Sequence, residues 1–200
     1  MSCPLNAQAA AIFVPIEYAD VVHVNVLAAK SRAAPVNIIT IPRLELLNAT
    51  VGAPLCKSVL LALQWGNVKQ HYWTDSTTVL GWIQCEELWL VSANNRVQEI
   101  RKLTHLTLWK IFQEHKSPAD LLSRGCSSHQ FSYSRCWEGP KWLLQTEENW
   151  PVTKPVFDEQ SFLKEKRKTN PTSKSLTFVC SLNQTENNES SSKLLVFFKL

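Results

Sequence analysis

The amino-acid sequence predicts an α/β fold, in which strands and helices alternate along the chain. Two apolar or valine-rich runs, 9–16 and 21–28, have the length and pattern of strands. A helical stripe of apolar residues begins at Leu44, and another strand-like run at 68–74 is followed by further helical patterns. An apolar content of 44% with eight tryptophans is sufficient for a hydrophobic core.

The first two runs are expected to form a hairpin. Residues 9–16 are apolar, as in a buried strand, and Pro15 lies near the end of this run, where proline is tolerated. Residues 21–28 alternate valines with polar side chains, so one face of this strand should contact water. Residues 17–20 are the expected hairpin connection.

A long helix is predicted over 42–65. The apolar residues that form its buried stripe are Leu44, Leu47, Val51, Leu55 and Val59. Pro42 suits the first helical turn. Pro54, in contrast, lies in the interior, where proline removes a hydrogen bond at a cost of about 3 kcal/mol. We therefore predict a kink or break near Gly52, and we expect Gly66 and Asn67 to end the helix.

After the long helix, the sequence predicts a strand that is followed directly by an acidic residue. The strand 68–74 runs into Asp75, and Ser76 is expected to cap a helix that continues to about residue 83. A loop with an exposed Trp89, a helix at 95–103 and an alternating last strand at 106–112 follow. Ser117 is then expected to cap a helix with Asp120 in its first turn.

Composition limits the classes of function. The 21 Lys and Arg against 17 Asp and Glu give a net charge of +4, without the basic excess of a dedicated nucleic-acid binder. The six cysteines form no C-x-x-C pair, which disfavours zinc and indicates a reducing compartment. No basic n-region precedes the apolar run 9–16, which is too short to span a membrane, so we expect an intracellular protein that is not secreted and has no membrane partner.

Six short segments occur in an informative order. They are IPRLELL (41–47), WTDSTTVLGWI (73–83), NRVQEI (95–100), SPADLLSRG (117–125), CWEGPKWL (136–143) and NWP (149–151). Together they resemble the ribonuclease H-like region of Bel/Pao-type retrotransposon polyproteins, and the resemblance covers about residues 7–151.

The resemblance implies a ribonuclease H-like mixed sheet flanked by helices over residues 5–125, with strand 68–74 parallel to strand 106–112. An irregular aromatic extension at 126–151 follows in the family. The remaining residues, 152–200, are rich in Ser, Thr, Asn and Lys and are expected to be a mostly disordered tail. Disorder is expected over about 152–193, and the short apolar end at 194–200 has no assigned role.

The resemblance also implies a chemistry. Ribonuclease H-like enzymes cleave phosphodiesters with two Mg²⁺ ions held by carboxylates from different elements. The residues that match the family's catalytic metal ligands are Glu45, Asp75 and Asp120; each alone has a structural alternative as a helix-dipole carboxylate, a cap or a first-turn acid. The basic residues expected along the nucleic-acid path are Lys30, Arg32, Arg43 and Arg124, although 30–35 is equally well explained as a solvated turn.

One part of the family pattern is not matched. The family carries a further aspartate on its first, central strand in an Asp-Ala-Ser-like element, where this sequence reads Ser2-Cys3-Pro4. The family's histidine in the last strand is Ile111 here, and its asparagine before the late helix is Ser117. We therefore expect an incomplete sheet that lacks the first strand. The strands at 9–16 and 68–74 should then pair directly or present open edges.

Three functions follow as hypotheses. The first is an N-terminally truncated fragment of a retrotransposon polyprotein that retains a nucleic-acid-binding fold but is catalytically impaired, and so is not an enzyme as encoded. The second is an active Mg²⁺-dependent ribonuclease H that cleaves the RNA strand of RNA–DNA hybrids. The third is a non-functional translated relic. The expected partners are an RNA–DNA hybrid and the reverse transcriptase and integrase regions of the parent polyprotein, which act in reverse transcription and DNA integration.

Overall fold

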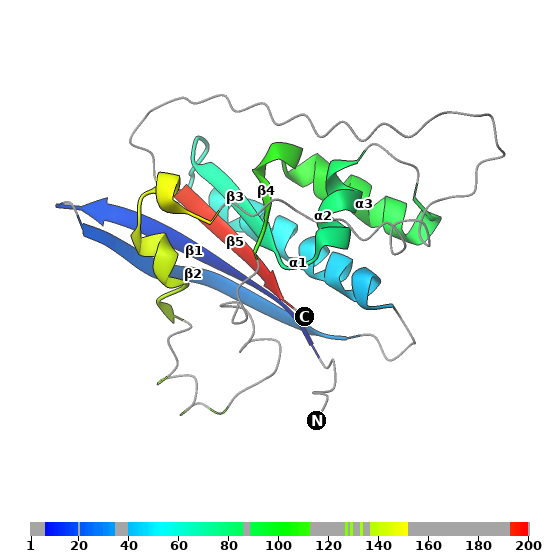
Figure 1. The fold of residues 1–200 in the computed structure, drawn as a ribbon, viewed down its shortest axis with the longest axis horizontal. Coiled ribbons are helices and arrows are strands. Elements are labelled where there is room, and N and C mark those ends of the chain that lie inside the picture. The colour runs from blue at the N-terminus through cyan, green and yellow to red at the C-terminus, as the bar shows by residue number, and fades with distance from the viewer. Residues whose placement is uncertain are drawn as a thin grey trace.

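The computed structural model describes residues 7–19, 21–34, 40–85, 89–112, 127, 129, 133, 137–151 and 193–199. The fold is α/β, as predicted. Its centre is a mixed five-stranded sheet with the order β2-β1-β5-β3-β4. Helices pack on one face of this sheet, and short 3-10 turns pack on the other (Figure 1).

The predicted hairpin is present. Strand β1 (Ala7–Tyr18) pairs antiparallel with β2 (Val21–Ala33), and both strands are longer than expected. Ala19 takes a positive φ of 49° in the connection. The register shifts between Ile12 and Phe13, so that Leu27 on β2 has no partner in β1, which is the signature of a β-bulge.

The second pair of strands is parallel, which confirms the prediction for 68–74 and the last strand. Strand β3 (Lys69–Thr74) lies beside β4 (Trp109–Ile111). The last strand is shorter than predicted, because η1 (Leu106–Leu108) is a 3-10 helix. Only the last residues of the alternating run pair with β3, while the preceding turn brings the chain from the third helix to the sheet.

The two pairs of strands are joined by the end of the chain. Strand β5 (Lys193–Lys199) lies between β1 and β3, antiparallel to the first and parallel to the second. The strands at 9–16 and 68–74 therefore neither pair directly nor face each other as open edges, as we had expected. The short apolar end of the expected tail, to which the sequence assigned no role, thus forms the middle of the sheet. Residues 152–192, where disorder was expected, lie outside the described part of the chain.

Helix α1 (Ile41–Ala62) is continuous through Pro54, so the predicted break near Gly52 is wrong. The helix buries one side against the sheet, and this packing offsets the missing hydrogen bond. The predicted end is also wrong: the helix stops at Ala62, and Gln64 rather than Gly66 takes the left-handed conformation, with φ 56°.

The buried side of α1 is rotated relative to the predicted stripe. Leu44 and Val51 are buried as expected, but Leu47, Leu55 and Val59 are only half-buried. The most deeply buried side chains are Leu46, Ala49, Ala53 and Cys56. Because α1 is apolar on several sides, spacing alone did not define its inner face. By length and composition α1 could also cross a membrane, a property that the core helices of water-soluble proteins share.

The two shorter helices complete this layer. Helix α2 (Thr77–Gln84) is capped by Ser76, whose hydroxyl accepts a hydrogen bond from the Val79 amide at 3.2 Å, as predicted. Helix α3 (Val91–Leu103) begins earlier than expected. The expected exposure of Trp89 is wrong: its side chain is buried, and its indole N–H donates to the Trp82 carbonyl at 3.2 Å.

The sheet separates two cores. The larger core lies between the sheet and helices α1, α2 and α3. The smaller core lies on the opposite face, where η3 (Lys141–Leu144) and the residues around η4 (Glu147–Asn149) place Trp142, Leu143 and Trp150 against the strands. In Figure 1 these turns are yellow and lie in front of the sheet. The predicted helix that Ser117 would cap lies outside the described residues.

Candidate metal and nucleic-acid site

Asp75 lies where β3 ends, at the position that sequence reasoning predicted. The turn around it is held by three hydrogen bonds. The Thr74 carbonyl accepts from the Phe112 amide at 2.8 Å, the Thr74 hydroxyl accepts from the Ser76 amide at 3.2 Å, and Ser76 caps α2. Asp75 itself is half-buried. A carboxylate therefore occupies the carboxyl end of a central parallel strand, where active sites of α/β proteins collect.

Glu45 lies at the same end of the molecule. Helix α1 runs along the sheet in the direction opposite to β3, and a short connection joins the two elements. The start of α1 and the end of β3 therefore lie at the same end of the sheet (Figure 1). Glu45 is roughly 25 Å from the C-terminal end of α1 at 1.5 Å per residue. Strand β3 spans roughly 20 Å. The two residues thus lie toward the same end of the sheet, and the convergence of their carboxylates on a common metal stays a prediction.

The third acid, Asp120, lies outside the described residues, and so does Arg124. Within the described ranges, no group of three or more His, Cys, Asp or Glu side chains is arranged to hold a metal ion. Carboxylate oxygen is the donor that Mg²⁺ prefers, but a two-metal centre needs several such groups. Glu45 and Asp75 alone do not make the donor set of a two-metal centre.

The strand beside β3 ends in a lysine, Lys199. In the parallel register, Tyr72 pairs with Val196 and Trp73 with Phe197. Continued by two positions, past the end of β3, this register would bring the backbone position of Lys199 alongside that of Asp75. A carboxylate on the neighbouring strand would have to occupy this position to share a metal with Asp75, and here the position is a lysine.

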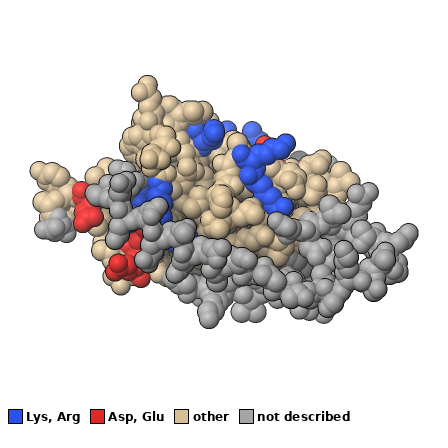
Figure 2. Space-filling model, turned by 90° about the horizontal axis from the view of Figure 1, so that it is seen from above, with Lys and Arg blue, Asp and Glu red and all other residues tan. Residues whose placement is uncertain are grey.

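The described basic residues lie near the same end. Strand β2 runs parallel to β5, since both are antiparallel to β1, and the exposed Lys30 and Arg32 lie close to the end of β2. Arg43 follows in the first turn of α1 and is half-buried. On the face shown in Figure 2, Lys and Arg form separate groups and not one continuous basic surface.

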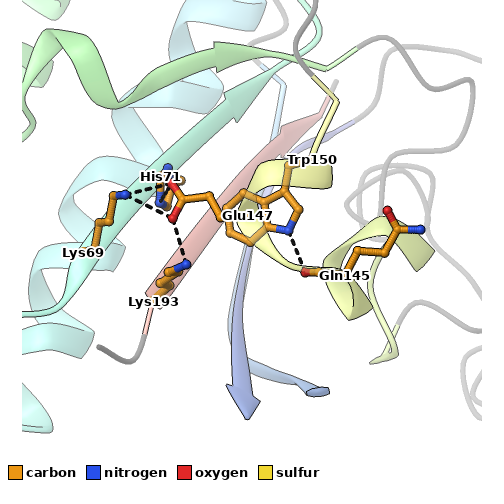
Figure 3. Close-up of polar contacts among 6 residues, drawn as sticks. All are labelled: Lys69, His71, Gln145, Glu147, Trp150 and Lys193. Carbon is orange, nitrogen blue, oxygen red and sulfur yellow. Dashed lines mark hydrogen bonds and ion pairs between the residues drawn. The ribbon is translucent and has the colours of Figure 1, made fainter. Parts of the chain in front are cut away.

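A second polar cluster was missed by sequence reasoning. Glu147 in η4 accepts hydrogen bonds from Lys69 of β3 at 2.8 Å and pairs with Lys193 of β5 at 2.7 Å (Figure 3). Its carboxylate is also 3.4 Å from Nε2 of the buried His71. This Glu147 cluster lies at the start of β3, at the opposite end of that strand from Asp75.

The electrostatics of the cluster are unusual. Burial opposes the charge of Glu147, but hydrogen bonds from Lys193 and Lys69 outweigh it and lower the pKa to about 2. Burial, with help from the charge of Lys110, lowers the pKa of His71 to about 3. His71 is thus neutral at neutral pH, and one carboxylate faces several cations. This arrangement suits a clamp between strands and not a cation site.

The sequence offered little signal for this cluster. Glu147 belongs to a pair of adjacent acids in a polar turn, which is typical of a solvated surface. Its partners Lys69, His71 and Lys193 are far away along the chain, and only the fold brings them together.

The mixed sheet with its flanking helices is consistent with a ribonuclease H-like α/β domain. Residues 5–76 match the family described as the Pao retrotransposon-like RNaseH-like domain, which confirms the resemblance over those residues. The matched segment contains Glu45, Asp75 and the basic residues at 30, 32 and 43, and it ends before Asp120. No curated protein and no solved structure matches the chain.

Proposed function

We propose that this chain is a ribonuclease H-like domain of retrotransposon origin that binds nucleic acid and hydrolyses it poorly. The observation that carries the proposal is the register at the end of the central strands. Asp75 follows the last residue of β3 and Lys199 is the last residue of β5, so the register, continued past Trp73 and Phe197, would bring these two positions together. The matched family supports the nucleic-acid-binding part.

A lysine at this position would act on a bound metal ion through its charge. Neighbouring strands are about 4.8 Å apart, so an ammonium group on β5 would repel a divalent ion bound at Asp75. A carboxylate at the same position would attract that ion and supply an oxygen ligand. The binding of Mg²⁺, and with it hydrolysis, should therefore be weak in the natural sequence.

Nucleic acid would approach the same end through phosphate contacts. Lys30, Arg32 and Arg43 are the described candidates, and Arg124 is a further candidate. With a net charge of only +4, the affinity should be low and should fall steeply with salt. In a parent polyprotein, such a domain would act inside the cell beside the reverse transcriptase and integrase regions.

The binding test compares an RNA–DNA hybrid with a DNA duplex of the same sequence by fluorescence anisotropy at two salt concentrations. The double variant Lys30→Ala with Arg32→Ala should weaken hybrid binding several-fold and should lower the salt dependence, because two phosphate contacts are lost. The matched control is Lys57→Ala with Lys102→Ala, which removes the same charge from exposed positions on α1 and α3. Equal effects of both double variants would count against a defined phosphate path.

The metal test uses Lys199→Asp and the control Lys199→Asn. Both variants remove the lysine, but only the first adds a ligand. Mg²⁺ affinity, measured by calorimetry, should rise about tenfold or more in Lys199→Asp alone. Hybrid cleavage should rise with it, and adding Asp75→Asn should abolish both gains. Efficient cleavage by the unmodified chain would instead support the hypothesis of an active ribonuclease. That hypothesis is favoured by the topology, which brings Glu45 and Asp75 toward the same end of the sheet.

A measurement of folding stability distinguishes a non-functional relic from the other two hypotheses. A domain that folds should show a cooperative thermal transition by circular dichroism, with fixed near-ultraviolet signals from its buried tryptophans. A gradual, non-cooperative loss of helical signal would support the relic instead.

A further inference from the structure

Strand β5 differs from the other strands in how it reaches the sheet. Strands β1 and β2 form a hairpin, and β3 and β4 are connected through α2 and α3. Strand β5 comes from the far end of the sequence and lies between these two units. Without it, β1 and β3 would each present a row of unpaired backbone N–H and C=O groups inside the molecule.

The space between β1 and β3, which we call the central slot, is specific for one strand direction. Its occupant pairs antiparallel with β1, from Phe13 opposite Leu195 to Ala9 opposite Lys199. It pairs parallel with β3, from Lys69 opposite Lys193 to Trp73 opposite Phe197. Both conditions are met only by a strand that runs in the direction of β5.

The slot also selects the side chains of its occupant. Leu195 and Val196 are both fully buried, the first in the core against the tryptophans of η3 and η4 and the second in the core against the helices. A central strand that is covered on both faces must be apolar at successive positions. The segment Leu194–Phe198 has this composition, which would favour self-association if it were exposed.

At the end of the central slot where β5 begins, the surrounding residues favour a positively charged side chain. Lys193, the first residue of β5, is held by Glu147 at 2.7 Å, and its Nζ lies 5.5 Å from the centre of the Trp150 ring (Figure 3). The Trp150 indole is itself fixed by donation to the Gln145 carbonyl at 3.1 Å. A basic residue immediately before the apolar run is therefore recognised by groups that belong to the rest of the fold.

From these observations we propose that the central slot is a strand-binding site, and that its ligand is an apolar strand preceded by a basic residue. In this chain the ligand is the segment Lys193–Lys199, held by non-covalent contacts alone. The same segment supplied by a separate molecule occupies the slot when the chain's own β5 is disabled.

The test disables the strand within the full chain. Val196→Asp places a charge in the core and should abolish cooperative melting, because neither core can close. Val21→Asp is the matched control, since it makes the same change at an exposed position of β2 and should leave the melting curve unchanged.

The second measurement supplies the strand from outside. Residues 188–200, attached to the C-terminus of an inert soluble carrier, are mixed with the denatured Val196→Asp chain before refolding. The natural segment should restore cooperative melting and should co-elute with the chain. A carrier with Val196→Asp should do neither, and a carrier with Lys193→Glu should bind at least several-fold more weakly.

Two results would overturn the proposal. One is a Val196→Asp chain that melts like Val21→Asp, which would show that β5 is not needed in the sheet. The other is a natural carrier segment that neither binds nor restores melting, which would show that the slot does not accept a separate strand.

Discussion

At the scale of single residues, Glu147 links three parts of the molecule. Its two oxygens contact Lys69 on β3 and Lys193 on β5, while its own turn packs Trp150 on His71 in an edge-on arrangement with ring centres 5.2 Å apart. Among the described residues, neither ring nitrogen of His71 makes a hydrogen bond. The cluster therefore depends on His71 staying neutral and Glu147 staying ionised.

This dependence predicts sensitivity to acid. The pKa of His71 falls from 6.5 to about 3 on folding, so the unfolded chain takes up its proton first and stability declines as the pH drops below about 6.5. The pKa of Glu147 falls from 4.5 to about 2 on folding. The stability that Glu147 contributes is therefore fully present above pH 4.5 and is lost as the pH falls from 4.5 to about 2. Urea unfolding at pH 7 and pH 4 should differ by on the order of 2 kcal/mol.

Two variants separate this effect from general acid destabilisation. Glu147→Gln should be less stable at pH 7 and should lose less on further acidification below about pH 4.5. Glu148→Gln makes the same change at the exposed neighbour and should follow the natural protein at each pH. Identical pH profiles for all three proteins would contradict the assigned role of Glu147.

At the scale of elements, α1 shows how packing overrides local preference. Pro54 lies inside the helix, where it cannot donate to the carbonyl of Thr50, and yet α1 continues to Ala62. Nearby Ala49 and Ala53 are almost fully buried, so the small side chains let the helix lie close to the sheet. The free energy lost with the missing hydrogen bond at Pro54 is therefore offset by the burial of apolar side chains in the same turns of the helix.

Replacing this proline should stabilise the protein. Pro54→Ala restores a backbone hydrogen bond and a strong helix former, so the free energy of unfolding should rise by about 1–3 kcal/mol. Chemical denaturation monitored by circular dichroism measures the change. Lys57→Ala, at an exposed position one turn later, should change stability by less than about 0.5 kcal/mol. A destabilised Pro54→Ala protein would indicate that the proline ring itself fills space against the core.

At the scale of the whole molecule, the sheet is continuous only through β5. Since this strand is covered on both faces and paired on both sides, its amides should exchange with solvent only when the whole domain unfolds. Hydrogen exchange followed by mass spectrometry should show peptides from Lys193–Lys199 as protected as those from Lys69–Thr74. Both should be more protected than the edge strand Val21–Ala33. Faster exchange in β5 than in β2 would place β5 outside the folded unit.

The sequence predicted the features that depend on residues close together in the chain, and it missed those that depend on residues far apart. The hairpin, the strand before Asp75 and the Ser76 cap were predicted, because each depends on neighbouring residues. The position of β5 was missed, because a short apolar run carries no local signal of its partners, and a polar stretch separates it from the rest. Trp89 was misjudged for the same reason, since its burial depends on α2 and not on its own charged loop.

The convergence of the predicted site residues stays a prediction. Asp75 and Glu45 were placed at one end of the sheet from their positions in a strand and a helix, which is a consequence of topology. The lysine at the end of β5 could not be related to Asp75 from the sequence, because the place of β5 in the sheet was unknown. The Glu147 cluster also joins residues from three separate elements and is visible only in three dimensions.

The place of β5 also has a consequence for biosynthesis. Translation delivers the chain from its N-terminus, and β5 follows every other described element in the sequence. At 5–20 residues per second, the interval between β4 and β5 is on the order of ten seconds. During that interval the β1–β2 hairpin and the β3–β4 unit can form and can contact α1, but they cannot join into one sheet. The sheet is therefore completed late and through long-range pairing, a combination that slows folding and leaves the edges of β1 and β3 exposed in the nascent chain.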